Sequence, residues 1–513
     1  MEEEDDQHRA MKSKMNKAKK AKKKRAKARK EELEARKKLQ EMEVAPPQPK
    51  EENDDDLEFE DPYGDEFEEE DIIEEEEIKD QDDNEMKMKN VYYAPTAKVE
   101  NEELEFDMSA YGSLHQLKLD WPALSFDFFR DHMGQDRTRL PTSLWFVAGT
   151  QTDTGRGNQI TLVRVSNIHR TKDEAAEDGM VIVEDVDEEG EATLEHRKID
   201  HPDGNVNRVR AMPQEPGIVA TWSDSGKVHL FDARKKLSTL NLPCSSSAHS
   251  QDTPVYSLTK HKEEGYAMDW SLCRTGRFAT GDCAKEIYVW DVSPNGVQIE
   301  PQPFKGHGGS VEDLQWSPTE ENVFASCSTD GSVKIWDVRA KNRAMLSQAA
   351  HDVDVNVISW NRKVSYLLAS GSDDCSFKVW DLRQFSGSNK SDPVGWFHGF
   401  HTDSITSIEW SPHDESVIAC TSADHQTSIW DLALEEDREY ARQASDKGFS
   451  EDVLDENGKP VQFPPQLLFI HAGVRDPKEI HFHPQITGFT GVTGESGFDI
   501  FLCEPLDPKS QIA

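Results

Sequence analysis

The side chains best suited to chemistry in this chain of 513 residues are its 99 carboxylates and 18 imidazoles. Many of the carboxylates stand in two runs: residues 51–86 hold 22 acidic residues and one basic residue, and residues 173–195 hold eleven acidic residues and no basic one. General acid–base catalysis needs carboxyl groups held at a fixed separation with tuned pKa values. Acidic runs repel themselves and form no core, but they attract polycations. The carboxylates therefore favour binding over catalysis.

The absence of catalytic and metal-binding motifs supports the same conclusion. The sequence contains no G-x-x-x-x-G-K-[ST] loop, no G-x-S-x-G elbow and no H-E-x-x-H. Its seven cysteines are scattered and include no C-x-x-C pair, which argues against a disulfide framework and against a zinc site. We therefore expect no enzyme, no cofactor and no metal.

The first hundred residues are strongly charged. Residues 9–38 contain sixteen Lys or Arg, a density that predicts nuclear or nucleolar import or a contact with RNA. The chain's hydrophobic content of 35% is below the usual ~45–50%, and its formal net charge is −40. We predict a disordered extension made of a basic arm (1–45) and an acidic segment (46–100). No apolar run reaches the ~18–20 residues of a membrane helix, so we expect no membrane partner.

The imidazoles follow a repeat. Each of four histidines lies 29 residues before the tryptophan of a Trp-Asp pair, and another tryptophan follows each histidine after nine residues. The four pairs are His261 with Trp290, His307 with Trp336, His351 with Trp380 and His401 with Trp430. Successive Trp-Asp pairs lie 46, 44 and 50 residues apart, a period typical of repeat architectures. Since the spacing recurs, we interpret these histidines as structural.

Each unit contains short alternating runs separated by turns. Residues 323–326 and 332–336 flank the turn Thr329-Asp330-Gly331, and the pattern fits four short strands per unit. Such a unit cannot bury both faces alone, so the units must stack. Weaker matches bring the number of units to seven. They are residues 206–231, residues 144–165 as a first blade, and residues 467–471, 479–483, 488–492 and 497–502 as a last blade. The prediction is an all-β, seven-bladed propeller over residues 121–505, closed by a strand at 124–129 that removes the sheet edges.

Three further segments complete the predicted organisation. Apolar residues about one helical turn apart predict an amphipathic helix at 101–120 that packs on the propeller. The acidic stretch predicts an insertion at 171–197. Residues 434–463, rich in Asp, Glu, Gly and Pro, predict an inserted loop between the last two blades.

The repeats resemble WD40 repeats, and several stretches resemble one family of them. The chain is similar to the glutamate-rich WD-repeat proteins, the ribosome-assembly propellers, over about residues 101–505. More distantly it resembles the histone-binding propellers of the retinoblastoma-binding type. The stretches that carry the closer resemblance are Asn207-Arg208-Val209-Arg210, Gly281-Asp282-Cys283, residues 310–318 and 354–360, Ala423-Asp424-His425-Gln426 and Pro465-Gln466-Leu467-Leu468-Phe469.

The resemblance implies a hydrogen-bonded tetrad of His, Ser or Thr, Asp and Trp in each repeat, because a buried imidazole and indole need polar partners. Two tetrads are complete in the sequence: His307, Ser326, Asp330 and Trp336, and His351, Ser370, Asp374 and Trp380. Two others depart from the pattern. The unit of His401, Asp424 and Trp430 has Cys420 in place of Ser or Thr, and the unit of His261, Thr280 and Trp290 has Ala284 where Asp is expected. We expect those two tetrads to be weaker.

The resemblance also implies a function. It indicates a dedicated chaperone of the basic ribosomal protein uL3, monomeric and nucleolar, that delivers its client to pre-60S particles; shuttling from the cytoplasm stays open. In related propellers the third and fifth residues after the repeat histidine, and the residue before the tetrad Asp, reach the rim of the channel, which here predicts a client-binding rim. Its residues are Glu264, Tyr266, Glu312, Asp354, Asn356 and Asp373. The acidic segment is the second predicted client site, through Asp54, Asp55, Asp56, Glu68, Glu69, Glu70, Glu74, Glu75, Glu76 and Glu77.

Two other functions remain open. A histone chaperone would use the same physics, because histones are also polycations. A substrate receptor of a cullin-ring ubiquitin ligase is suggested by Trp336-Asp337-Val338-Arg339 and Trp380-Asp381-Leu382-Arg383, which resemble adaptor-docking boxes but are frequent in ordinary WD repeats.

Overall fold

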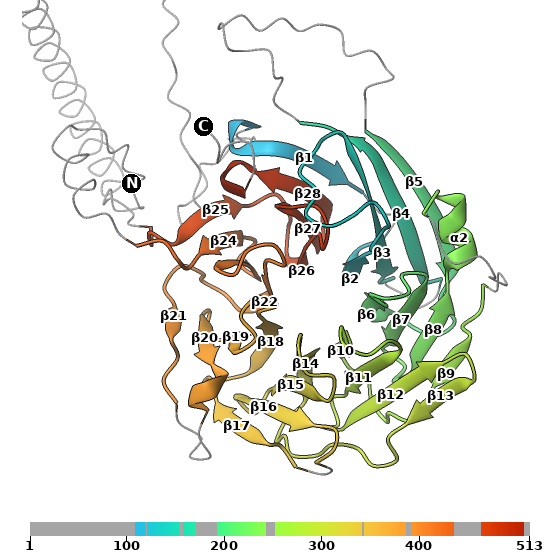
Figure 1. Cartoon of the computed structure of the whole chain (residues 1–513), viewed down its shortest axis with the longest axis vertical. Helices are drawn as coiled ribbons and strands as arrows, with labels where there is room; N and C mark the ends of the chain where they lie inside the picture. Colours follow the sequence, from blue (N-terminus) through green and yellow to red (C-terminus); the bar gives the residue numbers. More distant parts are fainter. Residues whose placement is uncertain are drawn as a thin grey trace, which may run out of the picture. The chain divides into compact units, whose positions relative to one another are not determined.

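The structure is a computed structural model that describes residues 108–118, 121–152, 157–170, 192–242, 252–340, 343–385, 391–435 and 463–506. All of them belong to the compact unit Met88–Ala513. They form seven four-stranded antiparallel sheets arranged as blades around a central channel (Figure 1). The basic arm, the acidic segment, most of the acidic insertion and most of the loop 434–463 lie outside the described residues.

Each blade runs from an inner strand at the channel to an outer strand. The first three blades are β2 (Ala123–Phe128), β3 (Thr142–Thr150), β4 (Gln159–Ile168) and β5 (Thr193–Asp200); β6 (Val206–Ala211), β7 (Ile218–Ser223), β8 (Val228–Asp232) and β9 (Tyr256–Leu258); and β10 (Ala267–Trp270), β11 (Arg277–Gly281), β12 (Ile287–Ser293) and β13 (Gly296–Ile299). Helix α2 (Arg234–Thr239) follows β8.

The next three blades repeat this order. They are β14 (Val311–Trp316), β15 (Val323–Ser328), β16 (Ser332–Asp337) and β17 (Leu346–Ala349); β18 (Val355–Trp360), β19 (Leu367–Ser372), β20 (Phe377–Asp381) and β21 (Gly395–Phe397); and β22 (Ile405–Trp410), β23 (Val417–Ser422), β24 (Thr427–Asp431) and β25 (Leu467–His471). The seventh blade is β26 (Pro477–Phe482), β27 (Phe489–Gly494), β28 (Gly497–Cys503) and β1 (Tyr111–Leu117). The 3₁₀ turns are η1 (Met108–Ala110), η3 (Leu382–Gln384) and η4 (Glu504–Leu506).

The ring closes through β1, which pairs antiparallel with β28 as the outer strand of the last blade. The predicted helix at 101–120 is therefore wrong for residues 111–117, and residues 101–107 lie outside the described chain. The reason is that β28 would otherwise expose an edge of unpaired backbone groups. Tyr111 adds apolar contact by packing edge-on against Phe469 and Phe501.

Two other assignments change for the same reason. The strand predicted at 124–129 to close the ring is β2, the inner strand of the first blade. Residues 467–471, expected in the last blade, form β25 and complete the sixth blade by pairing with β24. Because the last blade takes its outer strand from the N-terminal side, residues 467–471 complete the preceding blade instead. The inserted loop 434–463 therefore falls between two strands of the sixth blade, and its predicted position between the last two blades is wrong.

The core lies between neighbouring blades. One cluster joins Ile287 and Val289 of the third blade to Leu314, Trp316 and Phe324 of the fourth, all buried. Similar clusters join the other blades. Among the described residues, the apolar faces of the sheets are covered mainly by the adjacent sheets, which explains why the repeats occur as a closed set.

In each WD repeat, the hydrogen bonds of the tetrad link residues of neighbouring strands and turns. In the fourth blade, His307 Nε2 lies 2.7 Å from Ser326 Oγ, which accepts from Trp336 Nε1 at 2.8 Å, while Nδ1 faces Asp330 at 3.1 Å. The fifth blade has the same geometry with His351, Ser370, Asp374 and Trp380. The hydrogen bonds from His351 and Ser376 help to lower the pKa of Asp374 to about 2, although burial alone would raise it.

The two tetrads expected to be weaker are complete, each through a substitute. In the third blade, Asp282 takes the place expected at Ala284, with Oδ2 2.7 Å from His261 Nδ1. In the sixth, Ser428 replaces Cys420: its hydroxyl lies 2.8 Å from both His401 Nε2 and Trp430 Nε1.

The exchange at the sixth blade has a simple geometric cause. Ser428 on β24 pairs directly opposite Cys420 on β23. Opposite residues of an antiparallel pair have adjacent side chains, so a hydroxyl on either strand can reach the same imidazole and indole.

Candidate functional site

The inner strands share a local irregularity where they begin. In six of the seven, the pairing register with the next strand shifts across the second residue. Such a bulge leaves one residue unpaired and redirects its side chain. The bulged residues are Leu124, Asn207, Glu312, Asn356, Thr406 and Lys478. In the third blade, Tyr266 directly precedes β10. We call this end of the channel the upper mouth.

The six predicted rim residues lie at the upper mouth on three consecutive blades, the third to the fifth. Glu264 Oε2 accepts a hydrogen bond from Asn207 Nδ2 at 3.1 Å, and Asn356 Nδ2 donates to Asp373 Oδ1 at 2.7 Å. The rim thus combines carboxylates with amides that orient them. Asp373 is exposed, and the others are half-buried.

Negative charges crowd one another at this mouth. Burial raises the pKa of Glu312, and the neighbouring carboxylate of Asp354 raises it further. Burial likewise raises the pKa of Tyr266 to about 12, with added contributions from Glu264 and Glu312. Because like charges raise these values, a cation at the rim would be stabilised by the same groups.

A buried ion-pair network crosses the middle of the channel and was not predicted. Glu479 on β26 accepts from Arg208 Nη1 and, at 2.6 Å, from Arg210 Nη2, both on β6. Its second oxygen accepts from the backbone N–H of Phe126 at 2.8 Å. Burial alone would raise the pKa of Glu479, but the two guanidiniums and His481 outweigh it and hold that pKa well below its usual value.

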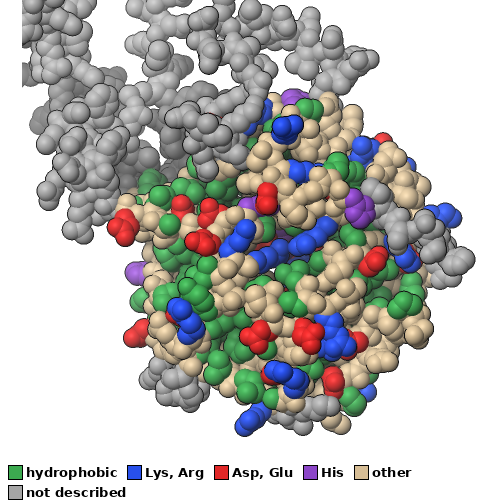
Figure 2. Space-filling model, in the orientation of Figure 1, with side chains coloured by type: hydrophobic (Ala, Val, Ile, Leu, Met, Phe, Trp, Pro, Cys, Tyr) green, Lys and Arg blue, Asp and Glu red, His purple; other side chains and the backbone are tan. Residues whose placement is uncertain are grey.

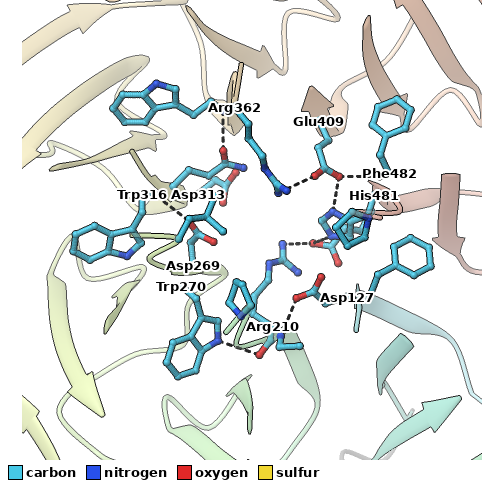
Figure 3. Close-up of a pocket in the computed structure, with 18 of the residues that line it drawn as sticks. Asp127, Arg210, Asp269, Trp270, Asp313, Trp316, Arg362, Glu409, His481 and Phe482 are labelled. Carbon is cyan, nitrogen blue, oxygen red and sulfur yellow. Dashed lines mark hydrogen bonds and ion pairs between the residues drawn. The ribbon is translucent and has the colours of Figure 1, made fainter. Parts of the chain in front are cut away.

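The network extends to the sixth blade. His481 Nδ1 lies 2.9 Å from Glu409 Oε2, and the backbone N–H of Phe482 donates to the same oxygen at 3.0 Å (Figure 3). Burial would lower the pKa of His481, but Glu409 and Glu479 together raise it to about 9. His481 is therefore a cation at neutral pH, and the network contains three cations around two carboxylates.

Side chains of one inner strand also bind the backbone of the next. Asp269 Oδ2 accepts from Trp316 N at 2.8 Å, Asp313 Oδ2 from Ile358 N at 3.1 Å, and Ser407 Oγ from Ile480 N at 3.2 Å. The remaining junctions of the ring are bridged similarly, by Ser125 and Asp127, Arg208, Ser359 and Glu479. Glu409 adds a second contact at the junction of Ser407. These contacts fix the register of neighbouring blades at the channel.

A sequence signal for the network existed. In β6, Arg208 and Arg210 stand at alternate positions among buried apolar residues, and Glu479 and His481 do so in β26. Alternation places both members of a pair on one face of a strand, and two such strands facing a common channel must neutralise each other's charge. The stretch Asn207-Arg208-Val209-Arg210 was recognised only as a family resemblance, and its arginines were assigned no role.

Neither a metal centre nor a membrane span is found in the described part of the chain. No group of three or more His, Cys, Asp or Glu side chains there is placed to hold a metal ion. No helix among the described residues is long and apolar enough to cross a membrane.

The closed ring of seven four-stranded sheets with its tetrads defines a WD-repeat β-propeller. The family model of the WD domain, G-beta repeat, matches residues 300–337, 343–381 and 394–431. The model of the histone-binding protein RBBP4, which also covers a component of the CAF1 complex, matches residues 101–169.

Three relatives define the family more closely. The chain is 40% identical to the ribosome assembly protein rrb1 of Schizosaccharomyces pombe over 86% of this chain and 92% of that protein. It is 42% identical to the glutamate-rich WD repeat-containing protein 1 of Dictyostelium discoideum (78% and 82%) and to the protein HEAT STRESS TOLERANT DWD 1 of Arabidopsis thaliana (79% and 88%). The chain belongs to this family of glutamate-rich WD-repeat proteins.

Proposed function

We propose that the protein is a ribosome-biogenesis factor that acts as a dedicated chaperone of a basic ribosomal protein, uL3. It captures this client and delivers it to pre-60S particles in the nucleolus. The identity to a ribosome assembly protein over most of both chains supports the biological process. The observation that carries the chemistry is the crowded set of acidic groups at the upper mouth, where burial and nearby carboxylates raise the pKa values of Glu312 and Tyr266.

The rim would bind Lys or Arg side chains of the client. A cation placed between Glu312 and Asp354 gains from both carboxylates and relieves their mutual repulsion. Tyr266 offers an aromatic face to the same cation. Ribosomal proteins are polycations that bind RNA through the salt-dependent phosphate contribution. An acidic binder competes with the RNA phosphates for the same basic side chains of the client. The acidic segment chiefly raises the rate at which the client is captured.

The first experiment is a pulldown from nuclease-treated nuclear extract with quantitative mass spectrometry, comparing the full chain with a chain that lacks residues 1–90. One dominant ribosomal protein, recovered less after truncation, is the expected result. Recovery that survives truncation would place the main contact on the propeller. Histones in place of ribosomal proteins would overturn the assignment of the client.

A second experiment tests the rim itself. Glu312→Lys together with Asp354→Lys should weaken binding of purified client by ~2–3 kcal/mol, roughly 30- to 150-fold, at about 1 kcal/mol or more for each reversed charge. The control, Glu215→Lys with Glu320→Lys, makes the same change in net charge on exposed turns at the opposite ends of β6 and β14. Equal affinities for the two variants would contradict the rim assignment.

Histone binding is the second candidate function, because the histone-binding family model matches residues 101–169. In this chain that region contains β1 to β4. Competition between histones and the ribosomal client for the purified protein separates the two: the chaperone hypothesis expects the ribosomal protein to displace histones at equal concentration. The adaptor-docking boxes have a local explanation, since Arg339 and Arg383 each pair with the Asp of their own box at 2.7 Å.

A further inference from the structure

The opposite end of the channel has a different chemistry from the rim. There the inner strands end, and a cavity of about 110 Å³ opens between their last residues and the turns that follow. We call this end the lower mouth. A volume of this size is several times what one ordered water requires, so it can accept a short side chain. The turns contribute an apolar collar of Pro213, Leu272, Pro318 and Pro484, and the buried side chains of Met212 and Phe482 also line the cavity.

Two arginines project into this cavity from opposite sides of the ring. Arg130 follows β2 and Arg362 follows β18. Figure 3 shows Arg362 extending toward the centre, and Figure 2 shows Lys or Arg side chains across the middle of the face in view, with hydrophobic side chains beside them. Within the described part of the chain, the Arg130 guanidinium has no hydrogen bond or ion pair. Burial lowers the pKa of Arg130, and the charge of Arg362 lowers it further.

Five carboxylates also line the cavity, and each makes its shorter hydrogen bonds to groups other than these two arginines: Asp127, Asp269, Asp313, Glu409 and Glu479. Glu409 lies 3.4 Å from Arg362 Nη2, a long contact, while its other oxygen is held by His481 and a backbone N–H. Asp127 lies near both Arg130 and Arg210, but its hydrogen bond goes to the backbone N–H of Ala211. Burial raises the pKa of Asp269 to about 7, so this side chain carries only part of a negative charge at neutral pH.

We propose that the lower mouth is a binding site for an acidic peptide, which inserts one carboxylate side chain between Arg130 and Arg362. Charge-assisted hydrogen bonds from guanidinium to carboxylate are the strong type, and Arg130 has its donors free for them. The collar suits the apolar residues beside that carboxylate. A protein partner fits better than RNA, because a chain with net charge −40 repels a polyanion at long range. The contact of one peptide carboxylate with the buried arginines is little affected by that long-range repulsion. This proposal is independent of the client assigned to the rim.

The test is fluorescence anisotropy with a labelled ten-residue peptide that carries two Glu among Phe and Ile residues. The same peptide with Gln in place of Glu is the matched probe. Arg130→Gln with Arg362→Gln should weaken binding of the Glu peptide at least tenfold, and the Gln peptide should bind as weakly to the unaltered protein. Arg339→Gln with Arg475→Gln, which removes two exposed guanidiniums elsewhere, should leave binding unchanged.

Two further arms keep the test decisive. Arg130→Gln alone breaks no ion pair and should fold normally, and Leu272→Glu should repel the peptide without touching either arginine. Inorganic phosphate should compete only weakly. Equal binding of the Glu peptide to the arginine variants and their controls would overturn the proposal, as would tighter binding of a ten-nucleotide RNA at the same mouth.

Discussion

Glu479 offers the sharpest test of how the ring is held together. It is 1% exposed and accepts hydrogen bonds from two arginines and one backbone N–H. Glu479→Gln keeps the shape of the side chain but leaves Arg208 and Arg210 without their shared carboxylate. Removing one partner of a buried ion pair costs ~3–5 kcal/mol. With an unfolding entropy of ~2.1 cal/mol/K per residue over about 390 residues, that cost lowers Tm by roughly 4–6 °C.

The measurement is differential scanning calorimetry of both proteins at pH 7 and at acid pH. Because the folded pKa of Glu479 is lowered, its stabilisation is present above the ordinary value of 4.5 and is lost as the pH falls through the folded value. The difference in Tm should therefore shrink well below pH 4.5. Glu495→Gln is the control, since Glu495 is exposed and lies 3.7 Å from an exposed arginine; it should change Tm by less than about 1 °C. Equal shifts for the two variants would refute the assigned role of Glu479.

Three other predictions concern buried polar groups. Ser428→Ala removes the hydroxyl that serves the sixth-blade tetrad and should lower Tm by roughly 2–4 °C, more than Cys420→Ala, in a thermal melt. Burial raises the pKa of the Asp269 carboxyl, so the unaltered protein should lose stability as the pH rises from about 4 to about 7. Asp269→Asn should reduce this loss, measured as the free energy of unfolding in urea titrations. His481→Gln should remove a decline in Tm between about pH 6.5 and pH 9, since the raised pKa of His481 makes its stabilisation complete below 6.5 and lost above 9. A pH profile unchanged by either of the last two substitutions would contradict the assignment.

The repeat could be predicted from the sequence because the spacing between its histidine and its tryptophan is set by one hydrogen-bonded contact. A histidine and a tryptophan 29 residues apart must meet at the same hydroxyl, as His307 and Trp336 do at Ser326. That requirement fixes the lengths of the intervening strands and turns, and hence the blade. The bulges at the upper mouth fall at equivalent positions for the same reason.

The parts that sequence analysis missed depend on partners distant in the chain. Residues 111–117 have apolar positions compatible with a helix, but they pair with β28 almost 400 residues later. The tetrad of the sixth blade is completed by Ser428 on the strand opposite Cys420, which a linear motif cannot reveal. Glu479 and Arg210 are 269 residues apart and meet only because the ring closes.

The channel network also explains how the two mouths can differ. Arg208 and Arg210 are neutralised by Glu479 in the middle of the channel. That pairing limits how far they neutralise the upper rim, where burial and the neighbouring charge of Asp354 still raise the pKa of Glu312. It equally leaves Arg362 at the lower mouth with one long contact to Glu409, and Arg130 with no ion pair among the described residues. If every charged group of the ring were neutralised by its neighbours, neither mouth would carry an electrostatic potential that attracts a ligand. Glu479→Gln should therefore alter binding at the upper mouth as well as stability, because a freed Arg208, which donates to the backbone of Tyr266, would partly neutralise the rim.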